Sequence, residues 1–208
     1  MAAYYISLMV EKNPDGPYNL SGYCFGGIVA YEMAKQLQSM GKKVNKLILF
    51  DTVAFDYRER HSQFEKIKLR LKIILAQVNF LLNEPEGFLK NKKRYLKRKM
   101  DLVFSILKLK PNPQSVNTST TYLNKVSKNN TYLLNKYKIV PYHGTLYLFR
   151  AKTRETYIEE PKFYGWTSFV KKVKVINIGG HHYIILKKPE ILKEIAEKIQ
   201  IVLDEKNQ

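Results

Sequence analysis

Cysteine is almost absent from this sequence: one occurs among 208 residues, so no disulfide can form within the chain. A chain without disulfides suits a reducing compartment, and we expect the protein to be cytoplasmic. No apolar run approaches the roughly 20 residues that a membrane-spanning helix needs. The first residues also lack the basic start and the apolar stretch of a secretory signal. We therefore expect no membrane partner.

Acidic residues are scarce: 18 Asp and Glu stand against 36 Lys and Arg, which gives a net charge of +18. Such an excess can indicate nucleic acid or an anionic surface as a partner. The cations are mostly lysine, however, and the sequence has no zinc-ligand spacing, no RNA-binding aromatic signature and no helix-turn-helix pattern. We therefore expect no nucleic-acid partner and no bound metal.

The first quarter of the sequence predicts a strand, a helix and a second strand. Residues 18–21 are a strand candidate that follows a turn-forming segment. After Gly27 apolar residues recur at helical spacing as far as Gly41, which stands where a helix C-cap is expected. Residues 44–50 then form an apolar run typical of a buried strand, and the run ends at Asp51. A strand–helix–strand unit of this kind predicts a parallel sheet.

The stretch from about 55 to 138 is long, lysine-rich and helical in pattern. Between positions 58 and 110 there are 15 Lys or Arg against 5 Asp or Glu, more than half of the net charge of the chain. Strand-like sequence returns at 146–150 and 173–178, and an amphipathic helix covers about 189–203. We therefore predict one α/β domain over 1–208, with a mostly parallel sheet flanked by helices and a helical insertion at about 55–138.

Cys24 is the candidate nucleophile, because it lies in a Gly-x-Cys-x-Gly turn between a predicted strand and a predicted helix. The small flanking residues permit a strained backbone that exposes the nucleophile, and the helix that follows directs its amide dipoles at the reacting oxygen. The alternative is a small buried hydrophobe, the usual role of a free cysteine. A thiol at a helix N-terminus beside a histidine would have a lowered pKa.

A nucleophile of this kind needs a base and an orienting carboxylate. Asp51 ends an apolar strand, at the edge where functional residues of open α/β sheets collect, although it could instead cap the next element. His181 and His182 both follow a later strand, and local reasoning leaves them equal candidates for the base. His61, in the charged insertion, and His143, in a turn before a strand, have weaker claims. The order nucleophile, acid, histidine is that of the α/β-hydrolases.

Several segments share the pattern of one known family. They are 16–27 around Cys24, 30–34 in the next helix, 47–51 ending at Asp51, 137–151 after the insertion, 165–166, and 180–186. Together they resemble, over nearly the whole chain, the thioesterase domains that end non-ribosomal peptide synthetases and related polyketide and fatty-acid synthases. The segment 180–186 resembles the family's Gly-x-His-aromatic-x-x-Leu, which implies that the base is His182. The resemblance implies an α/β-hydrolase fold whose helical insertion forms a lid.

The resemblance also implies a reaction. An acyl or peptidyl chain arrives as a thioester on the phosphopantetheine arm of a carrier domain, and Cys24, deprotonated by His182 with Asp51 orienting it, attacks the carbonyl. The backbone N–H of Phe25 is expected to donate one hydrogen bond of the oxyanion hole. Water or an internal amine or hydroxyl then releases an acid or a macrocycle. The expected partners are a carrier domain and upstream synthetase modules, and no cofactor is bound by the domain itself.

The sequence departs from the family pattern in two ways. Most members have serine where this chain has Cys24, and a thioester intermediate reacts better with amines, relative to water, than an ester does. We therefore hypothesise that Cys24 favours aminolysis or cyclisation over hydrolysis. Family members also carry strands and a loop, with the second oxyanion-hole donor, before the segment that corresponds to residues 4–6. Relative to the family, we expect an N-terminally truncated fold.

Two other functions fit the sequence. The first is a stand-alone editing thioesterase, which shares the fold and the triad. The second is an inactive or incomplete hydrolase fold that serves as a carrier-docking module, which the basic insertion suits because carrier domains are commonly acidic. A simpler explanation of that charge is the solvated surface of a lid in a lysine-rich protein.

Overall fold

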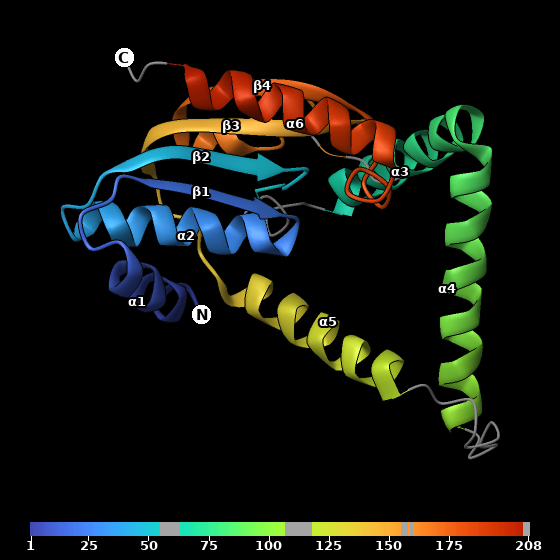
Figure 1. The fold of residues 1–208 in the computed structure, drawn as a ribbon. Helices are drawn as coiled ribbons and strands as arrows, with labels where there is room; N and C mark the ends of the chain where they lie inside the picture. Colours follow the sequence, from blue (N-terminus) through green and yellow to red (C-terminus); the bar gives the residue numbers. More distant parts are fainter. Residues whose placement is uncertain (55–62, 107–117, 155–157, 159, 206–208) are drawn as a thin grey trace.

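The structure of the chain is a computed structural model that describes residues 1–54, 63–106, 118–154, 158 and 160–205. Its described residues form one sheet of four strands in the order β1-β2-β3-β4, and all neighbouring strands run parallel. The strands are β1 Tyr18–Tyr23, β2 Val44–Phe50, β3 Tyr142–Thr153 and β4 Val170–His181 (Figure 1). Because the strands are parallel, all four end at the same edge of the sheet.

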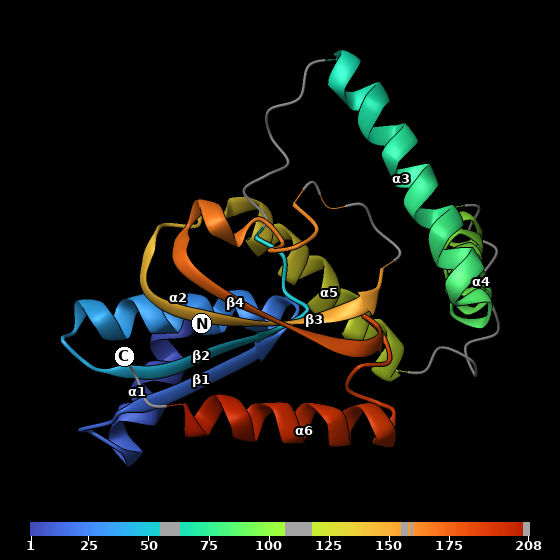
Figure 2. The same ribbon diagram turned by 90° about the horizontal axis from the view of Figure 1, so that it is seen from above.

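Helices cover both faces of this sheet (Figures 1 and 2). Helix α2 Phe25–Ser39 lies on one face with α1 Ala2–Lys12 packed against it, and α6 Pro189–Asp204 lies on the other face. Successive side chains of a strand point to opposite faces, and the central strands are apolar on both. Leu47 and Leu49 of β2 accordingly belong to the core under α2, whereas Ile48 and Phe50 belong to the core under α6. The predicted α/β fold with a mostly parallel sheet between helices is confirmed.

Strands β3 and β4 are each 12 residues long, well beyond the apolar runs that predict them. The two strands pair along most of their length, from Tyr142 opposite Val170 to Arg150 opposite Asn177 and on to Thr153 opposite His181. Backbone hydrogen bonds hold such a ladder whatever the side chains are, so polar residues can extend it past the buried segment. The extension matters for function, because the longer β4 carries the chain to His181 at the carboxyl edge.

Among the described residues between β2 and β3, where a helical insertion is predicted, three α-helices form: α3 Gln63–Asn83, α4 Pro85–Ile106 and α5 Thr118–Lys136. Both views show α4 away from the sheet, on the side of its carboxyl edge (Figures 1 and 2). The C-terminal part of α3 contacts the end of β4, where the Phe80 ring lies edge-on to His181 with centroids 5.3 Å apart. Among the described residues, no helix is both long and apolar enough to cross a bilayer.

Two neighbouring glycines at the start of α2 differ in the space around them. A Cβ atom at Gly27 would overlap the side chain of Thr52, whereas one at Gly26 would meet nothing within 4 Å. Thr52 cannot easily move, because it is 1% exposed, its hydroxyl donates to the Phe50 carbonyl, and its carbonyl accepts from the Trp166 indole.

We therefore expect Gly27→Ala to lower the free energy of unfolding by about 1–3 kcal/mol, the usual effect of overpacking. Gly26→Ala is the matched control, and it should leave the stability unchanged or raise it by up to about 1 kcal/mol, because alanine favours helix more than glycine does. Urea unfolding of both variants measures the difference. Equal midpoints for the two would contradict the close packing of α2 on Thr52.

Candidate active site

Cys24 occupies a strained turn between β1 and α2. Its backbone has φ 53° and ψ −117°, a conformation that side chains rarely adopt, and it is the N-cap of α2. A Cβ atom at Gly22 would overlap the backbone of Gly26, so the turn closes this tightly only with glycine there. The Cys24 N–H donates to the Phe50 carbonyl of β2 at 3.1 Å, which ties the turn to the neighbouring strand. The predicted geometry of a nucleophile turn is therefore present at Cys24.

Asp51 follows β2 and is almost completely buried, with four donors around its carboxylate. The Ala151 N–H and the Tyr164 hydroxyl donate to Oδ1, each at 3.0 Å. Arg154 Nη2 lies 3.1 Å from Oδ2, and His182 Nδ1 lies 2.6 Å from the same oxygen. Burial alone would raise the pKa of Asp51, but the hydrogen bond with His182 and the charge of Arg154 outweigh it and hold the pKa below its usual value.

His182 is held on several sides. Its ring stacks on Tyr23, with centroids 4.8 Å apart and planes at 28°, and the Tyr23 hydroxyl donates to the His182 carbonyl at 2.5 Å. The edge of Tyr183 approaches the ring at 5.3 Å. Burial would lower the pKa of His182, but hydrogen bonds to Asp51 and to Cys24 outweigh it and raise the pKa to about 9. The ring therefore bridges the carboxylate and the thiol.

The thiol of Cys24 responds to these neighbours. Burial would raise its pKa, but the hydrogen bond with His182, the charge of that imidazole and the backbone N–H of Phe25 outweigh burial, so the pKa is lowered. A lowered thiol pKa beside a raised imidazole pKa favours a thiolate–imidazolium pair at neutral pH. Phe25 is the first residue of α2, and its N–H points at the sulfur.

The structure separates the four histidines of the chain. His182 reaches Asp51, whereas the adjacent His181 is buried against Phe80, and burial lowers its pKa. His181 Nδ1 has no hydrogen-bond partner among the described residues. His143 lies in β3 near the amino edge of the sheet, and His61 lies outside the described residues.

Two residues that contact Asp51 are missing from the sequence prediction. Arg154 comes directly after β3, at the carboxyl edge, and a charged residue at that position was a usable signal. Tyr164 gives no such signal, because its approach to Asp51 depends on a backbone φ of 55° in a loop before Gly165. Arg154 also stacks on Tyr164, with its guanidinium carbon 3.9 Å from the ring centroid.

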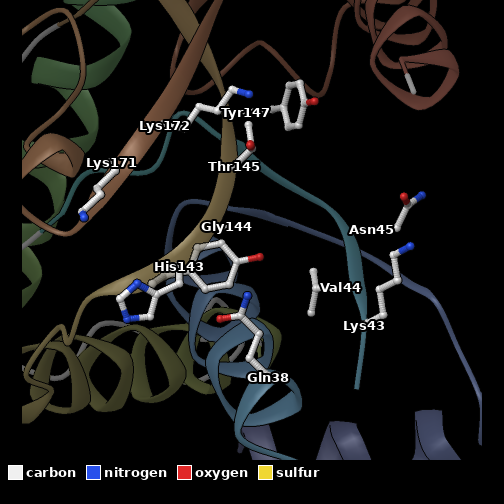
Figure 3. A pocket seen from close by; sticks show the side chains of 11 residues that line it. Gln38, Lys43, Val44, Asn45, His143, Gly144, Thr145, Tyr147, Lys171 and Lys172 are labelled. Carbon is white, nitrogen blue, oxygen red and sulfur yellow. The ribbon is translucent and has the colours of Figure 1, made fainter. Parts of the chain in front are cut away.

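A cavity of about 410 Å³ lies at the amino edge of the sheet, at the opposite ends of the strands from Cys24 (Figure 3). It is polar and basic, and its lining includes Lys43, His143, Lys171 and Lys172. Because it contains none of the residues around Cys24, we do not assign the candidate reaction to it. No group of three His, Cys, Asp or Glu side chains within the described ranges could hold a metal ion.

Comparisons with known proteins agree with this architecture. The family described as "Thioesterase domain" matches residues 1–200. A dimodular nonribosomal peptide synthase of Bacillus subtilis is 26% identical over 211 residues, which covers 100% of this chain and 8% of the synthase. The polyketide synthase PksR of Bacillus subtilis is 44% identical over 52 residues, which covers 25% of this chain and 2% of the synthase. The chain therefore spans less than a tenth of the length of either relative.

Solved structures of thioesterase domains share the fold. The NocB thioesterase domain in covalent complex with a fluorophosphonate nocardicin G analog superposes with a TM-score of 0.61 at 21% identity, covering 98% of this chain and 73% of that domain. The surfactin thioesterase domain SrfTE gives a TM-score of 0.53 at 18% identity, covering 99% of this chain and 76% of that domain. These likenesses confirm the predicted α/β-hydrolase fold. With a family match over residues 1–200, the chain belongs to the thioesterase domain family.

Proposed function

We propose that this chain releases acyl or peptidyl groups from the phosphopantetheine arm of a carrier domain, with Cys24 as nucleophile, His182 as base and Asp51 as the orienting carboxylate. The observation that carries the proposal is the hydrogen-bonded line from Cys24 through His182 to Asp51, at the carboxyl edge of the sheet. The matched relatives are synthetases, which supports a carrier-bound substrate. They do not favour the editing or the docking function.

The reaction would run in two steps. The Cys24 thiolate attacks the thioester carbonyl, and the negative oxygen of the tetrahedral intermediate accepts a hydrogen bond from the Phe25 N–H. The intermediate collapses, the carbon–sulfur bond to the carrier breaks, and the carrier thiolate takes the proton held on His182. In the second step His182 accepts a proton from water, or from an amine or hydroxyl of the acyl chain, as that group attacks the acyl-Cys24. Collapse regenerates the thiolate–imidazolium pair.

The insertion at about 55–138 would be the lid of this site. The C-terminal part of its helix α3 contacts the end of β4, directly before His182, through Phe80 against His181, and Arg94 of α4 lies over the Tyr183 ring at 5.4 Å. A lid in this place could exclude water from the acyl-enzyme. The proposal assigns no bound cofactor or metal to the chain. It requires a carrier domain as partner, upstream modules to load that carrier, and a reducing compartment such as the cytoplasm to keep the thiol free.

Alkylation of Cys24 with iodoacetamide tests the ion pair. In His182→Ala the thiol keeps its burial and the Phe25 N–H but loses the hydrogen bond and the charge of His182, so its pKa should rise. Wild type should therefore react at least about tenfold faster than His182→Ala at pH 7, and the two rates should converge above about pH 9.5.

The adjacent histidine supplies a matched control, because it has no bond to Asp51. His181→Ala should react within about twofold of wild type. Mass spectrometry follows the single adduct, since Cys24 is the one cysteine of the chain. Equal slowing in both histidine variants would count against the assignment of the base.

Turnover of an acyl-pantetheine thioester tests the nucleophile. Cys24→Ala should lose at least about a thousandfold in kcat, because triad members act as a unit. Rapid acid quenching of wild type should reveal one acyl group on the peptide that contains Cys24. Retained turnover in Cys24→Ala, or an acyl group on another peptide, would show that this thiol is not the nucleophile.

Cys24→Ser tests whether the thiol directs the outcome of release. We expect the ratio of amide to acid product, from a thioester substrate that carries a terminal amine, to fall in Cys24→Ser, because an ester intermediate discriminates less in favour of amines. Chromatography of the products of the two enzymes measures the ratio at one pH. An unchanged ratio of amide to acid product would contradict the hypothesis that the Cys24 thiol favours aminolysis, even if both enzymes are active.

A further inference from the structure

Arg154 contacts the Asp51 carboxylate and so contributes to the charge of the site. Its Nη2 donates to Asp51 Oδ2 at 3.1 Å, and its guanidinium carbon lies 3.9 Å from the centroid of the Tyr164 ring. The Arg154 side chain is 16% exposed, and the side chain of Asp51 is 0% exposed. The second terminal nitrogen, Nη1, is buried and has no hydrogen-bond partner among the described residues. The charge of Arg154 is therefore directed mainly at Asp51.

Arg154 and His182 meet on one oxygen atom. His182 Nδ1 lies 2.6 Å from Asp51 Oδ2, the oxygen that Arg154 also contacts, so the two cationic groups are no more than about 6 Å apart. At that separation, in a largely buried site, each positive charge disfavours the other.

The other titratable groups around His182 come from three parts of the chain: Cys24 and Tyr23 at the end of β1, Asp51 after β2, and His181 and Tyr183 beside it in sequence. The pKa of Tyr23 is raised by burial, and that of His181 is lowered by burial, so both are neutral at pH 7. The charge of the site at neutral pH is then set by four groups. They are Cys24, Asp51, His182 and Arg154.

These four charges balance differently in the two halves of the reaction. With the thiol proton on His182, as the proposed reaction requires before attack, the free enzyme has two anions, Cys24 and Asp51, facing two cations, His182 and Arg154. In the acyl-enzyme Cys24 is neutral, and Arg154 alone already balances Asp51. A protonated His182 would then leave a net positive charge in a buried site, which is unfavourable. A neutral His182 restores the balance.

We propose that Arg154 is a positioning residue that keeps His182 deprotonated once Cys24 is acylated and the proton has left with the carrier thiol, so that His182 is a free base for the second step. This inference rests on the proposed function. In the free enzyme the same charge stabilises the pair of anions, Cys24 and Asp51, and so supports formation of the thiolate. The fixed charge of Arg154 therefore assists both acylation and deacylation, because the charge that changes between these steps is that of the Cys24 sulfur.

The pH dependence of deacylation tests this role, with a p-nitrophenyl acyl ester as the probe. Its burst reports acylation, and its steady state reports deacylation. Arg154→Gln removes the charge and keeps a donor for Oδ2. The acidic limb of the steady-state rate should move up by about one pH unit, because the imidazolium of the acyl-enzyme loses a nearby cation. At pH 7 deacylation should slow by up to about tenfold, and the rates should converge at high pH.

Two controls separate charge from structure. Arg154→Lys keeps the cation, so its acidic limb should stay within about 0.3 units of the wild-type limb. Tyr164→Phe removes a neutral donor from Asp51 and leaves the charge unchanged. It should lower the rate at every pH without moving the limb. If Arg154→Gln also lowers the rate uniformly, with no displaced limb, the role is structural and the inference is wrong.

A titration supplies a readout that needs no turnover. Cys24→Ala removes the charge at residue 24, as acylation does. NMR of the His182 ring in this variant gives the pKa of His182 directly, and the signal is assigned by its loss in His182→Gln. Adding Arg154→Gln to Cys24→Ala should raise that pKa by about one unit. An equal pKa in the two proteins overturns the inference. A different result would show that the proposed function itself is wrong. In that case wild type gives no ester burst and Cys24→Ala turns over as fast as wild type, which would overturn both proposals.

Discussion

The carboxylate of Asp51 is the charge on which the arrangement of the site depends. It is buried, and its donors come from separate parts of the chain: the backbone of β3 at Ala151, the loop after β3 at Arg154, the loop before β4 at Tyr164, and the loop after β4 at His182. A buried anion is stable only when such partners satisfy it, so the carboxylate fixes where each of these segments passes. The hydrogen bonds that stabilise the buried Asp51 carboxylate include the one that orients His182. The same contacts therefore serve both the fold and the arrangement of the site.

The parallel sheet is what allows segments so far apart in sequence to meet. Each strand ends at the same edge, and each contributes its next residues to the site: the Cys24 turn after β1, Asp51 after β2, Arg154 after β3 and His182 after β4. The Cys24 N–H bonds to the last residue of β2, and the Asp51 N–H bonds to Phe149 of β3. The strand ladder thus continues into the site, and its rigid backbone supports a turn in which the proposed nucleophile, Cys24, is held at a positive φ.

Sequence reasoning predicts those parts of the site that follow from strand order and local pattern. The glycine turn at Cys24 and the acid at the end of an apolar strand, Asp51, are visible because a short βαβ unit fixes both. The choice between His181 and His182 is not local: it depends on which ring the loop after β4 turns toward Asp51 and which it buries against Phe80. Tyr164 is missed for a similar reason, since its contact with Asp51 requires a backbone conformation that its sequence does not specify. The helices of the insertion follow from apolar spacing, but their distance from the sheet depends on tertiary contacts.

A cysteine in this turn changes what the rest of the site must supply. A serine hydroxyl stays protonated until the moment of attack, so its histidine must be neutral beforehand and gains a charge during the step. A thiol beside an imidazole can give up its proton before attack, and with that proton on His182 the free site would hold two more charges than a serine site. The surroundings of Cys24 match that requirement, with a carboxylate and a guanidinium on one side of His182 and the first N–H of α2 at the sulfur. In the proposed reaction the thiol would lose its charge on acylation and regain it on release. A protein that keeps its other charges fixed can thus use the sulfur itself to determine when the imidazole holds the proton and when it gives it up.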